Sequence, residues 1–365
     1  MRVLVVLGTS AGGVGNHVHE LVGSLTGAGH HVVVACPAEV DAHFALHEVA
    51  AAVVAIEVSD RPHPARDARA VRELGRLVPG ADVVHAHGLR AAALAVLAVG
   101  RAPVPVVATL HNAAPSGALT GAVYAALERV VALRSALVLG VSADLVDRMR
   151  RLGARRTGLA VVAAPPHRAA TQDRYAVRAA LGVTGPTALG VVVARLAPQK
   201  GLDLLLDAHG ELAAEGLDLV TVVAGEGPLR AALQTRIDTE NLPVRLLGHR
   251  DDVPDLLAAA DVVVSSAVWE GQPVGIQEAL HAGAAVVATD VGGTAAVVGD
   301  AALLVPGGDP VSLSRAIRDV VRHGAVRDDL RSKAVERSAQ LPTAADALEA
   351  ALSSYRSVLP AGAGG

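Results

Sequence analysis

The stretch ADVVVSSAVWEGQPVGIQEALHAGAAVVATD, residues 260–290, contains the unit from which the fold is predicted. Its first apolar run predicts a buried strand, and its last apolar run predicts a second one. Between them, Pro273 suits the first turn of a helix, where its missing N–H would have no partner, and Gly283 suits the position just after a helix end. The stretch therefore predicts a strand, a loop, a helix over 273–282 and a second strand, which is one unit of a parallel sheet.

Units of this kind repeat in two series along the chain. Segments rich in Ala, Leu and Arg separate most of the apolar runs. These runs lie at 2–7, 31–36, 81–87, 104–110, 135–141 and 159–164, and then at 187–194, 217–225, 243–248, 260–266, 283–290 and 301–306. Strands that alternate with helices pack as parallel sheets with helices on both faces. The predicted fold class is α/β, with two Rossmann-like, doubly wound parallel-sheet domains.

The predicted boundaries follow the gap between the two series. The expected segments are a first domain over 1–168, a linker over 169–186, a second domain over 187–340, a C-terminal helix over 341–359 and a flexible tail over 360–365. The linker is richer in Pro, Arg and polar residues than its surroundings. The C-terminal helix places Leu348, Leu352 and Tyr355 on one face, and we expect it to pack back on the first domain.

Composition excludes several classes of protein. The 365 residues are 52% hydrophobic but only 1% aromatic, so the cores must consist of Val, Leu and Ala. A net charge of -4 gives no indication of nucleic-acid binding. The single cysteine, Cys36, cannot form an internal disulfide and suits a reducing cytosol. The first residues do not have the pattern of a signal peptide, and Arg101, Pro103 and Pro105 interrupt the most apolar window, so we expect no membrane span.

Two glutamates flank the start of the helix predicted over 273–282. Glu270 lies in the loop before the helix, and Glu278 lies inside it. The free N–H groups at a helix start favour an anion, and ligands of open α/β sheets bind at the carboxyl ends of strands. Two carboxylates beside an anion would repel it unless they bind hydroxyl groups instead. A nucleotide sugar has both a diphosphate and hydroxyls. The alternative is that both glutamates are solvated surface charges.

The segment ARLAPQKG, residues 194–201, follows another predicted strand. It places Arg195 and Lys200 at that strand's carboxyl end. Arg holds phosphate oxygens with a planar fork, while Lys provides a compact charge. Only two lysines occur in the chain, so a lysine here suggests a site that needs the smaller cation. A solvated pair of loop residues is the alternative interpretation.

In these segments the sequence resembles the family 4 retaining glycosyltransferases, which have the GT-B fold of two Rossmann-like domains facing a cleft. The matching segments are ARLAPQKGLDLLLDA (194–208), VVAGEGPLRAAL (222–233), LLGHRDDVPDLLAAADVVVSS (246–266), WEGQPVGIQEALHAGAAVVATDVGGTAAVV (269–298), GTSAGGVGNHVHELVGSLTGAGHHVVVA (8–35), DVVHAHG (82–88) and ATLHN (108–112). The resemblance spans nearly the whole chain and is weakest from about residue 37 to 80. It implies an acceptor-side first domain and a donor-side second domain.

The resemblance implies roles for individual residues. Arg195 and Lys200 would hold the donor diphosphate, Glu270 would contact the transferred sugar, and Glu278 would bind the ribose. His111 would lie near the transferring carbon. The remaining donor contacts would come from Gly12, Gly13, Gly225, Arg250, Val274 and Gly275, and the acceptor side would include His17 and His87.

The implied activity is a retaining, hexosyltransferase-type transfer from a UDP- or GDP-sugar to an acceptor such as a lipid-linked or cell-envelope glycan. The departing diphosphate assists the acceptor, so the family needs no side-chain nucleophile, metal or other cofactor. The pair Asp251–Asp252 is accordingly interpreted as helix N-caps. Two alternatives remain open: a nucleotide-sugar 2-epimerase of the same fold, and an inactive relative that only binds nucleotide.

The sequence departs from the family at two places. The family usually has Phe-Gly where this chain has Gln272-Pro273. Pro273 removes one backbone donor from the helix start, and Gln272 offers a hydrogen bond to the sugar instead of an apolar contact. The segment AAPPHR (163–168) replaces the family's Asn-Gly-Val-Asp.

Several other residues have more than one interpretation. His85, His87 and His111 could form a zinc site or a hydrogen-bonded group. Trp269 could stack on a sugar or fill a domain interface. Ser142 is predicted to cap a helix.

Five arginines in DRMRRLGARR (147–156) suggest a partner as well. The stretch Arg148–Arg156 could contact an anionic membrane surface or be a solvated helix face. We therefore expect a cytoplasmic protein, peripheral at the inner face of the membrane under the first of these interpretations.

Overall fold

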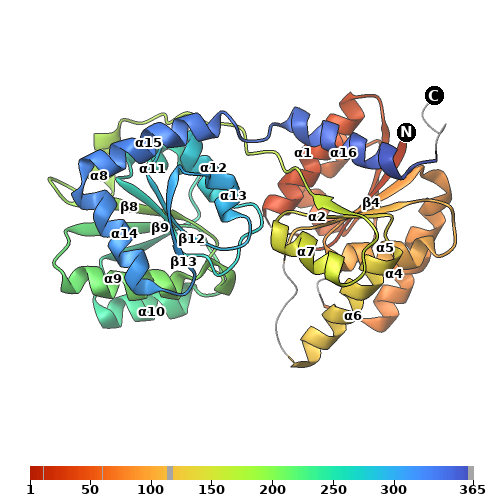
Figure 1. Ribbon diagram of the computed structural model, residues 1–365, viewed down its shortest axis with the longest axis horizontal. Helices are drawn as coiled ribbons and strands as arrows, with labels where there is room; N and C mark the ends of the chain where they lie inside the picture. Colours follow the sequence, from red (N-terminus) through yellow and green to blue (C-terminus); the bar gives the residue numbers. More distant parts are fainter. Residues whose placement is uncertain (11, 60, 113–117, 361–365) are drawn as a thin grey trace. The chain divides into compact units, whose positions relative to one another are not determined.

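The computed structural model describes residues 1–10, 12–59, 61–112 and 118–360. The chain divides into two compact units, which are described separately below. Unit 1 comprises Met1–Ala163 and Pro342–Gly365, and unit 2 comprises Ala164–Leu341. Each unit is a sheet between two layers of helices (Figure 1). The predicted tail lies outside the described residues except for Pro360.

Unit 1 contains a sheet of seven parallel strands in the order β3-β2-β1-β4-β5-β6-β7. The strands are β1 (Arg2–Leu7), β2 (His31–Cys36), β3 (Ala52–Ala55), β4 (Val83–His87), β5 (Val106–Leu110), β6 (Leu137–Gly140) and β7 (Thr157–Leu159). The sequence did not predict β3, an edge strand with no fully buried residue. The prediction of a strand over 159–164 was wrong, because β7 pairs with β6 earlier, through 157–159.

Helices cover both faces of this sheet (Figure 1). The first face carries α1 (Gly13–Gly27), α2 (Ala38–Phe44), α3 (Leu46–Val49) and α16 (Ala344–Val358). The second face carries α4 (Pro64–Leu77), α5 (Leu89–Val99), α6 (Ala118–Arg134) and α7 (Ala143–Arg151), with a short 3-10 turn, η1 (Val78–Gly80), after α4. Val, Leu and Ala fill both layers, as the low aromatic content requires.

The C-terminal helix α16 completes unit 1. It begins with a capping box, in which Thr343 and Asp346 each bond the other's backbone N–H. It packs beside α1 on the first face of the sheet (Figure 1). Its Tyr355 side chain is completely buried against strand residues. Two chain segments far apart in sequence therefore build one core.

Unit 2 contains six parallel strands in the order β10-β9-β8-β11-β12-β13. They are β8 (Ala188–Val193), β9 (Leu219–Ala224), β10 (Val244–Gly248), β11 (Val262–Ser265), β12 (Val286–Asp290) and β13 (Ala302–Pro306). One face carries α9 (Leu202–Ala214), α10 (Arg230–Glu240) and α14 (Pro310–Arg322). The other carries α8 (Arg174–Ala180), α11 (Val253–Ala259), α12 (Val274–His281), α13 (Thr294–Val298) and α15 (Gly324–Ser338). A 3-10 turn, η2 (Pro198–Lys200), precedes α9.

The segment 169–186, which we predicted as a linker, is part of unit 2. Val177 and Val183 are buried in the core of that unit. The buried carboxylate of Asp255 accepts hydrogen bonds from the backbone N–H groups of Thr171 and Gln172. The polar composition of the segment reflects its capping and ion-pair contacts rather than a free connection.

Asp261 connects α8 to the start of β11. Its carboxylate bonds Arg178, Arg174 and the backbone N–H of Leu189, the last at 2.8 Å. Burial alone would raise the pKa of Asp261, but the Leu189 hydrogen bond and the two guanidinium groups outweigh it and hold that pKa below its ordinary value. The ionised carboxylate therefore stabilises unit 2 above pH 4, and this contribution is lost as the pH falls through the folded-state pKa.

We predict that Asp261→Asn lowers the free energy of unfolding by about 2–3 kcal/mol at pH 7, because it leaves two arginines without their carboxylate. The loss should shrink as the pH is lowered below about 4, as measured by urea unfolding. The control is Asp147→Asn, which removes an exposed ion pair with Arg150 and should cost less than about 0.5 kcal/mol. A penalty for Asp261→Asn that does not change with pH would contradict this account.

Candidate functional site

The order of the strands in unit 2 reverses between β8 and β11. From β8 the chain proceeds to β9 and β10 on one side, and then to β11, β12 and β13 on the other. Ligands of doubly wound sheets bind at such a reversal, outside the carboxyl ends of the strands. A small cavity of about 30 Å³ lies at this point, and its lining includes Val193, Ala194, Lys200, Ser266, Glu270 and Gly275.

Lys200 is held in place by the turn that follows it. Gly201 has a φ of 57°, and a Cβ at this position would lie 2.1 Å from the carbonyl oxygen of Ser266. Only glycine allows the two loops to approach so closely. The Ser266 hydroxyl donates to the carbonyl oxygen of Lys200 at 3.2 Å. The loop after β8 is therefore fixed against the loop after β11.

Within this arrangement Lys200 and Glu270 form an ion pair. The Lys200 ammonium donates to Oε1 of Glu270, whose side chain is 8% exposed, against 25% for Lys200. The carbonyl oxygen of Glu270 accepts from the Gly293 N–H at 2.8 Å, and the amide of Gln199 donates to the carbonyl of Trp269 at 3.0 Å. The two charges that we predicted to bind different parts of a donor thus neutralise each other in the free protein.

The start of α12 lines the same cavity. The carbonyl oxygen of Pro273 accepts from the N–H groups of Ile276 and Gln277, each at 3.0 Å. Within the described part of the chain, the N–H groups of Val274 and Gly275 have no acceptor. The predicted helix is confirmed, although it begins at Val274, with Pro273 at the cap position. The helix start therefore retains two free donors beside Lys200.

Two further predicted donor residues lie nearby without joining the ion pair. Arg195 follows the cavity residue Ala194 and is exposed, and its guanidinium makes no hydrogen bond or ion pair with any described residue. Glu278 is half-buried, one turn into α12. Burial raises the pKa of Glu278, and the nearby Arg168 guanidinium opposes that shift. Sequence reasoning did not assign Arg168 a charge partner.

The carboxyl ends of β9 and β10 carry the remaining predicted donor residues. The N–H of Gly225 donates to the carbonyl oxygen of Gly248 at 2.7 Å. Arg250 is bound to the carboxylate of Asp252, with Nε at 2.8 Å. Asp252 occupies the predicted N-cap position of α11, but its carboxylate bonds Arg250 and makes no capping bond to the helix. The predicted capping role of Asp251 and Asp252 was therefore wrong. Arg250 would have to leave this pair to contact a base.

The side chain of Gln272, which we expected to contact a sugar, is already hydrogen-bonded within the protein. Oε1 of Gln272 accepts from the side-chain amide of Gln277 at 2.9 Å, and Gln277 is completely buried. Gln272 is thus oriented by the helix that it precedes. Trp269, next to the ion pair, is half-buried.

The predicted residues of unit 1 lie at its own strand reversal, between β1 and β4. His85 and His87 of β4 and His111 after β5 are buried, as is His17 of α1. Nδ1 of His87 lies 3.1 Å from Nε2 of His111. After β1, Gly12 occupies the N-cap position of α1 and Gly13 is the first residue of that helix.

The ring of His87 bonds that of His111, whereas both ring nitrogens of His85 bond hydroxyl groups, those of Tyr355 and Thr109. Among the described residues, no group of three or more His, Cys, Asp or Glu side chains is placed to hold a metal ion. The zinc interpretation of His85, His87 and His111 therefore receives no support. Burial lowers the pKa of His85 to about 3 and that of His17 to about 4, and it lowers the pKa values of His87 and His111 well below their ordinary value.

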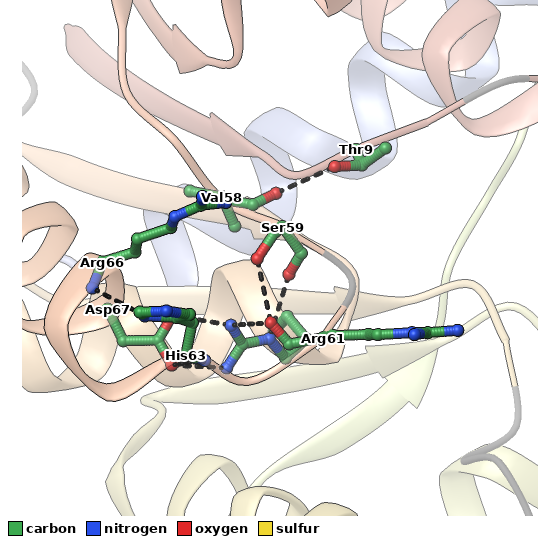
Figure 2. Close-up of polar contacts among 8 residues, drawn as sticks. Thr9, Val58, Ser59, Arg61, His63, Arg66 and Asp67 are labelled. Atoms are coloured by element: carbon green, nitrogen blue, oxygen red, sulfur yellow. Dashed lines mark hydrogen bonds and ion pairs between the residues drawn. The ribbon is translucent and has the colours of Figure 1, made fainter.

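Sequence reasoning missed an arginine that orders the loop after β3. The guanidinium of Arg90 bonds the carboxylate of Asp67 and the carbonyl oxygens of Ser59 and Arg61. On the other side, the hydroxyl of Thr9 donates to the carbonyl of Val58 at 3.2 Å (Figure 2). The buried Arg90, with four acceptor atoms, thereby ties Ser59 and Arg61 to Asp67 of α4. No motif signalled it, because two of the four acceptors are backbone carbonyl oxygens and Asp67 lies 23 residues away in sequence.

Two predictions at α7 need revision. Ser142 occupies the N-cap position, but its buried hydroxyl makes no capping bond, so the predicted cap was wrong. Arg148 is paired with the buried Glu128 at 2.6 Å, and Arg150 is paired with Asp147. The basic stretch is therefore partly neutralised. No helix in the described ranges combines the length and the apolar character of a bilayer-crossing segment.

Comparison with known families identifies the chain. The model for glycosyl transferases group 1 matches residues 188–323, and the model for the glycosyl transferase 4-like domain matches residues 12–165. A glycogen synthase of Mycobacterium tuberculosis is 30% identical over 346 residues, which cover 85% of this chain and 82% of the relative. The chain belongs to the group 1 glycosyltransferases.

Other relatives agree with this assignment. A UDP-Gal:alpha-D-GlcNAc-diphosphoundecaprenol alpha-1,3-galactosyltransferase of Escherichia coli is 34% identical over 123 residues, but the match covers only 32% of this glycosyltransferase and 32% of the relative. HepE of Anabaena, solved in complex with UDP and glucose, superposes with a TM-score of 0.82 at 20% identity, over 98% of this chain and 100% of HepE. The family models and the glycogen synthase match confirm the predicted group 1 family, and the HepE superposition confirms the GT-B fold.

We predict that Lys200 and Glu270 are energetically coupled in the free glycosyltransferase. Lys200→Met should lower the free energy of unfolding by about 1–3 kcal/mol, because it leaves the buried carboxylate of Glu270 without its cation. The double variant K200M/E270Q should be more stable than K200M alone, as measured by urea unfolding at pH 7. If the losses in free energy of unfolding measured for K200M and for E270Q simply add in the double variant, the ion pair contributes nothing to the fold of the site.

Proposed function

We propose that the protein transfers a sugar from a UDP- or GDP-sugar to a glycan acceptor, with retention of configuration and without a metal or other cofactor. The observation that carries this proposal is the Lys200–Glu270 pair beside two free N–H groups at the strand reversal of unit 2. A cation, a carboxylate and a helix start at one point match a diphosphate attached to a hydroxyl-rich group. The UDP complexes of HepE favour UDP.

The donor diphosphate replaces Glu270 as the partner of Lys200. Its oxygens accept from the N–H groups of Val274 and Gly275, and the exposed Arg195 reaches it from the loop after β8. The carboxylate of Glu270, released from Lys200, then accepts hydrogen bonds from hydroxyls of the sugar. Glu278 binds the ribose in the same way, and Gly225 and Arg250 border the nucleotide.

Catalysis follows from the charge that develops on the departing diphosphate. Lys200, Arg195 and the helix start stabilise that charge more strongly in the transition state than in the bound donor. The departing phosphate oxygen accepts the proton of the acceptor hydroxyl on the same face of the sugar. No side-chain nucleophile takes part, and the configuration is retained.

Unit 1 supplies the acceptor side in this proposal. The loop at Gly12 and Gly13 approaches the phosphates, His111 contacts the transferred sugar, and His17 and His87 lie toward the acceptor. The name of the Escherichia coli relative specifies a lipid-linked diphosphate acceptor, which favours a cell-envelope glycan here. An acceptor of this kind would place the protein at the cytoplasmic face of a membrane, where arginines of the stretch 148–156 that remain unpaired, such as Arg155, contact anionic lipid.

We predict that the protein binds UDP or GDP and that Lys200→Met weakens this binding by about 10–100-fold, because a charge-assisted contact to phosphate is lost. Isothermal titration calorimetry measures the affinity. Glu278→Gln should weaken it by about 10-fold through the ribose hydroxyls. The matched controls are Lys333→Met, the other lysine of the chain, which is partly exposed and paired with Asp329, and Glu336→Gln, which changes an exposed charge; both lie in unit 2.

Two outcomes would contradict the proposal. If neither nucleotide binds, or if K200M and K333M bind equally well, the donor site has been assigned wrongly. If the protein changes the sugar of the donor when no acceptor is present, it is the 2-epimerase rather than a transferase.

We predict that Glu270→Gln separates binding from transfer. Removing the carboxylate frees Lys200, so the affinity for UDP alone should stay the same or rise by about 3-fold. Turnover of the UDP-sugar, measured by release of UDP, should fall by about 100-fold, because the sugar loses a charged acceptor. A parallel fall in both quantities would mean that Glu270 only positions Lys200.

A further inference from the structure

Four side chains of the sheet in unit 1 point to one face, which α1 and α16 cover. They are His85 and His87, two residues apart on β4, and Thr109 and His111, two residues apart at the end of β5. Side chains two apart in a strand share a face. Both nitrogens of His85 are bonded at 2.8 Å, Nδ1 to the hydroxyl of Tyr355 and Nε2 to that of Thr109. A hydroxyl can donate or accept, so these contacts fix the orientation of the His85 ring for either tautomer.

The fixed ring of His85 supports the ring of His87. Their centroids are 4.1 Å apart, with the planes inclined at 39°. His87 in turn lies over His111, at 5.3 Å and 23°. Tyr355 of α16, His85, His87 and His111 therefore form a continuous column that ends at the carboxyl edge of the sheet.

The environment of His87 determines which of its nitrogens carries the proton. Nε2 of His87 is buried and has no hydrogen-bond partner among the described residues, whereas Nδ1 lies 3.1 Å from Nε2 of His111. A proton on Nε2 would bury an N–H group without an acceptor, and orphaned N–H groups are rarer in proteins than unpaired acceptors. A proton on Nδ1 instead donates to His111 and leaves only a lone pair unpaired. His87 is therefore the Nδ1–H tautomer.

The tautomer of His111 follows from that of His87. Its Nε2 accepts the hydrogen bond from His87, so a neutral His111 carries its proton on Nδ1. No described residue bonds Nδ1 of His111, and the residue keeps 9% of its surface exposed, so the Nδ1–H group is the ring donor that is left for a ligand. Burial, with His17 and His85 nearby, lowers the pKa of His111 well below its ordinary value, which keeps the ring neutral.

We infer that His111 offers the transferred sugar a neutral N–H donor and does not act as a base, and that His87 is the positioning residue that fixes this tautomer. The inference rests on the proposed function, because it assigns the oxygen acceptor that the N–H meets: a hydroxyl of the donor sugar or the oxygen of the departing phosphate. The proton for transfer is then accepted by the diphosphate alone.

The first test is spectroscopic and needs no substrate. Protein labelled with 15N in its histidine rings is studied by long-range 1H–15N correlation, which distinguishes a protonated from a bare ring nitrogen. We expect Nδ1–H with bare Nε2 for both His87 and His111, with the signals assigned through His87→Asn and His111→Asn. A bare Nδ1 on His111 would overturn the inference.

The second test compares two isosteric substitutions at His111. Asn can place an N–H donor near the former Nδ1, whereas Asp can only accept there. We expect His111→Asn to lower kcat/KM by no more than about 10-fold and His111→Asp to lower it by about 100-fold or more. If Asp is the more active of the two, His111 is a base and the inference is wrong.

The third test examines the positioning role of His87. His87→Asn retains a donor near Nδ1, and His87→Phe fills the space without one. We expect His87→Phe to lower kcat by about 10–100-fold with unchanged affinity for UDP, and His87→Asn to restore most of the loss. Equal losses in both variants would show that His87 only fills space.

The outcomes separate this inference from the proposed function. If the predicted tautomers are found but no UDP- or GDP-sugar is turned over, the proposed function fails and the assignment of the hydrogen bonds stands. If transfer depends on Lys200 but His111→Asp remains active, the inference fails and the function stands.

Discussion

Each unit is a parallel sheet with helices on both faces, and this constraint determines where chemistry can occur. Side chains in the middle of such a sheet are enclosed by α-helices, so polar groups reach a ligand only at the strand ends. Because the strands are parallel, all their carboxyl ends lie at one edge, and the reversal of strand order opens that edge at one place in each sheet. In unit 2 this place holds Lys200 and Glu270, and in unit 1 it holds the histidine column.

Much of this fold follows from short-range patterns. The Val-rich runs identify strands that are buried on both faces, and Pro273 and Gly283 bound α12 because their backbone restrictions are local. The edge strand β3 could not be found in this way, since its side chains are half-exposed and its apolar signal is weak. The segment 169–186 was misassigned because its polar residues bond Asp255 and Asp261, which lie more than eighty residues away in sequence.

The candidate site was predictable as a set of residues but not as a set of contacts. The spacing of Glu270 and Glu278 around a helix start predicts a donor site, which stays a proposal, and no local pattern shows that Lys200 pairs with Glu270 in the free protein. The sequence around Asp252 predicts a capping bond, but in the structure its carboxylate accepts from Arg250, two residues before it. The hydrogen bond between Tyr355 and His85 joins residues 270 positions apart, and no sequence motif predicts it. Long-range pairs between polar groups therefore account for most of what the sequence does not reveal.

The return of α16 to unit 1 also sets an order of events during synthesis. Unit 2, Ala164–Leu341, is complete as sequence before the last helix leaves the ribosome, whereas unit 1 still lacks the side chain that buries His85. Domains fold as their sequence emerges. Unit 1 begins first, but it needs α16 and is therefore completed after unit 2. Until Tyr355 arrives, Nδ1 of His85 lacks the hydroxyl group that it bonds in the folded unit.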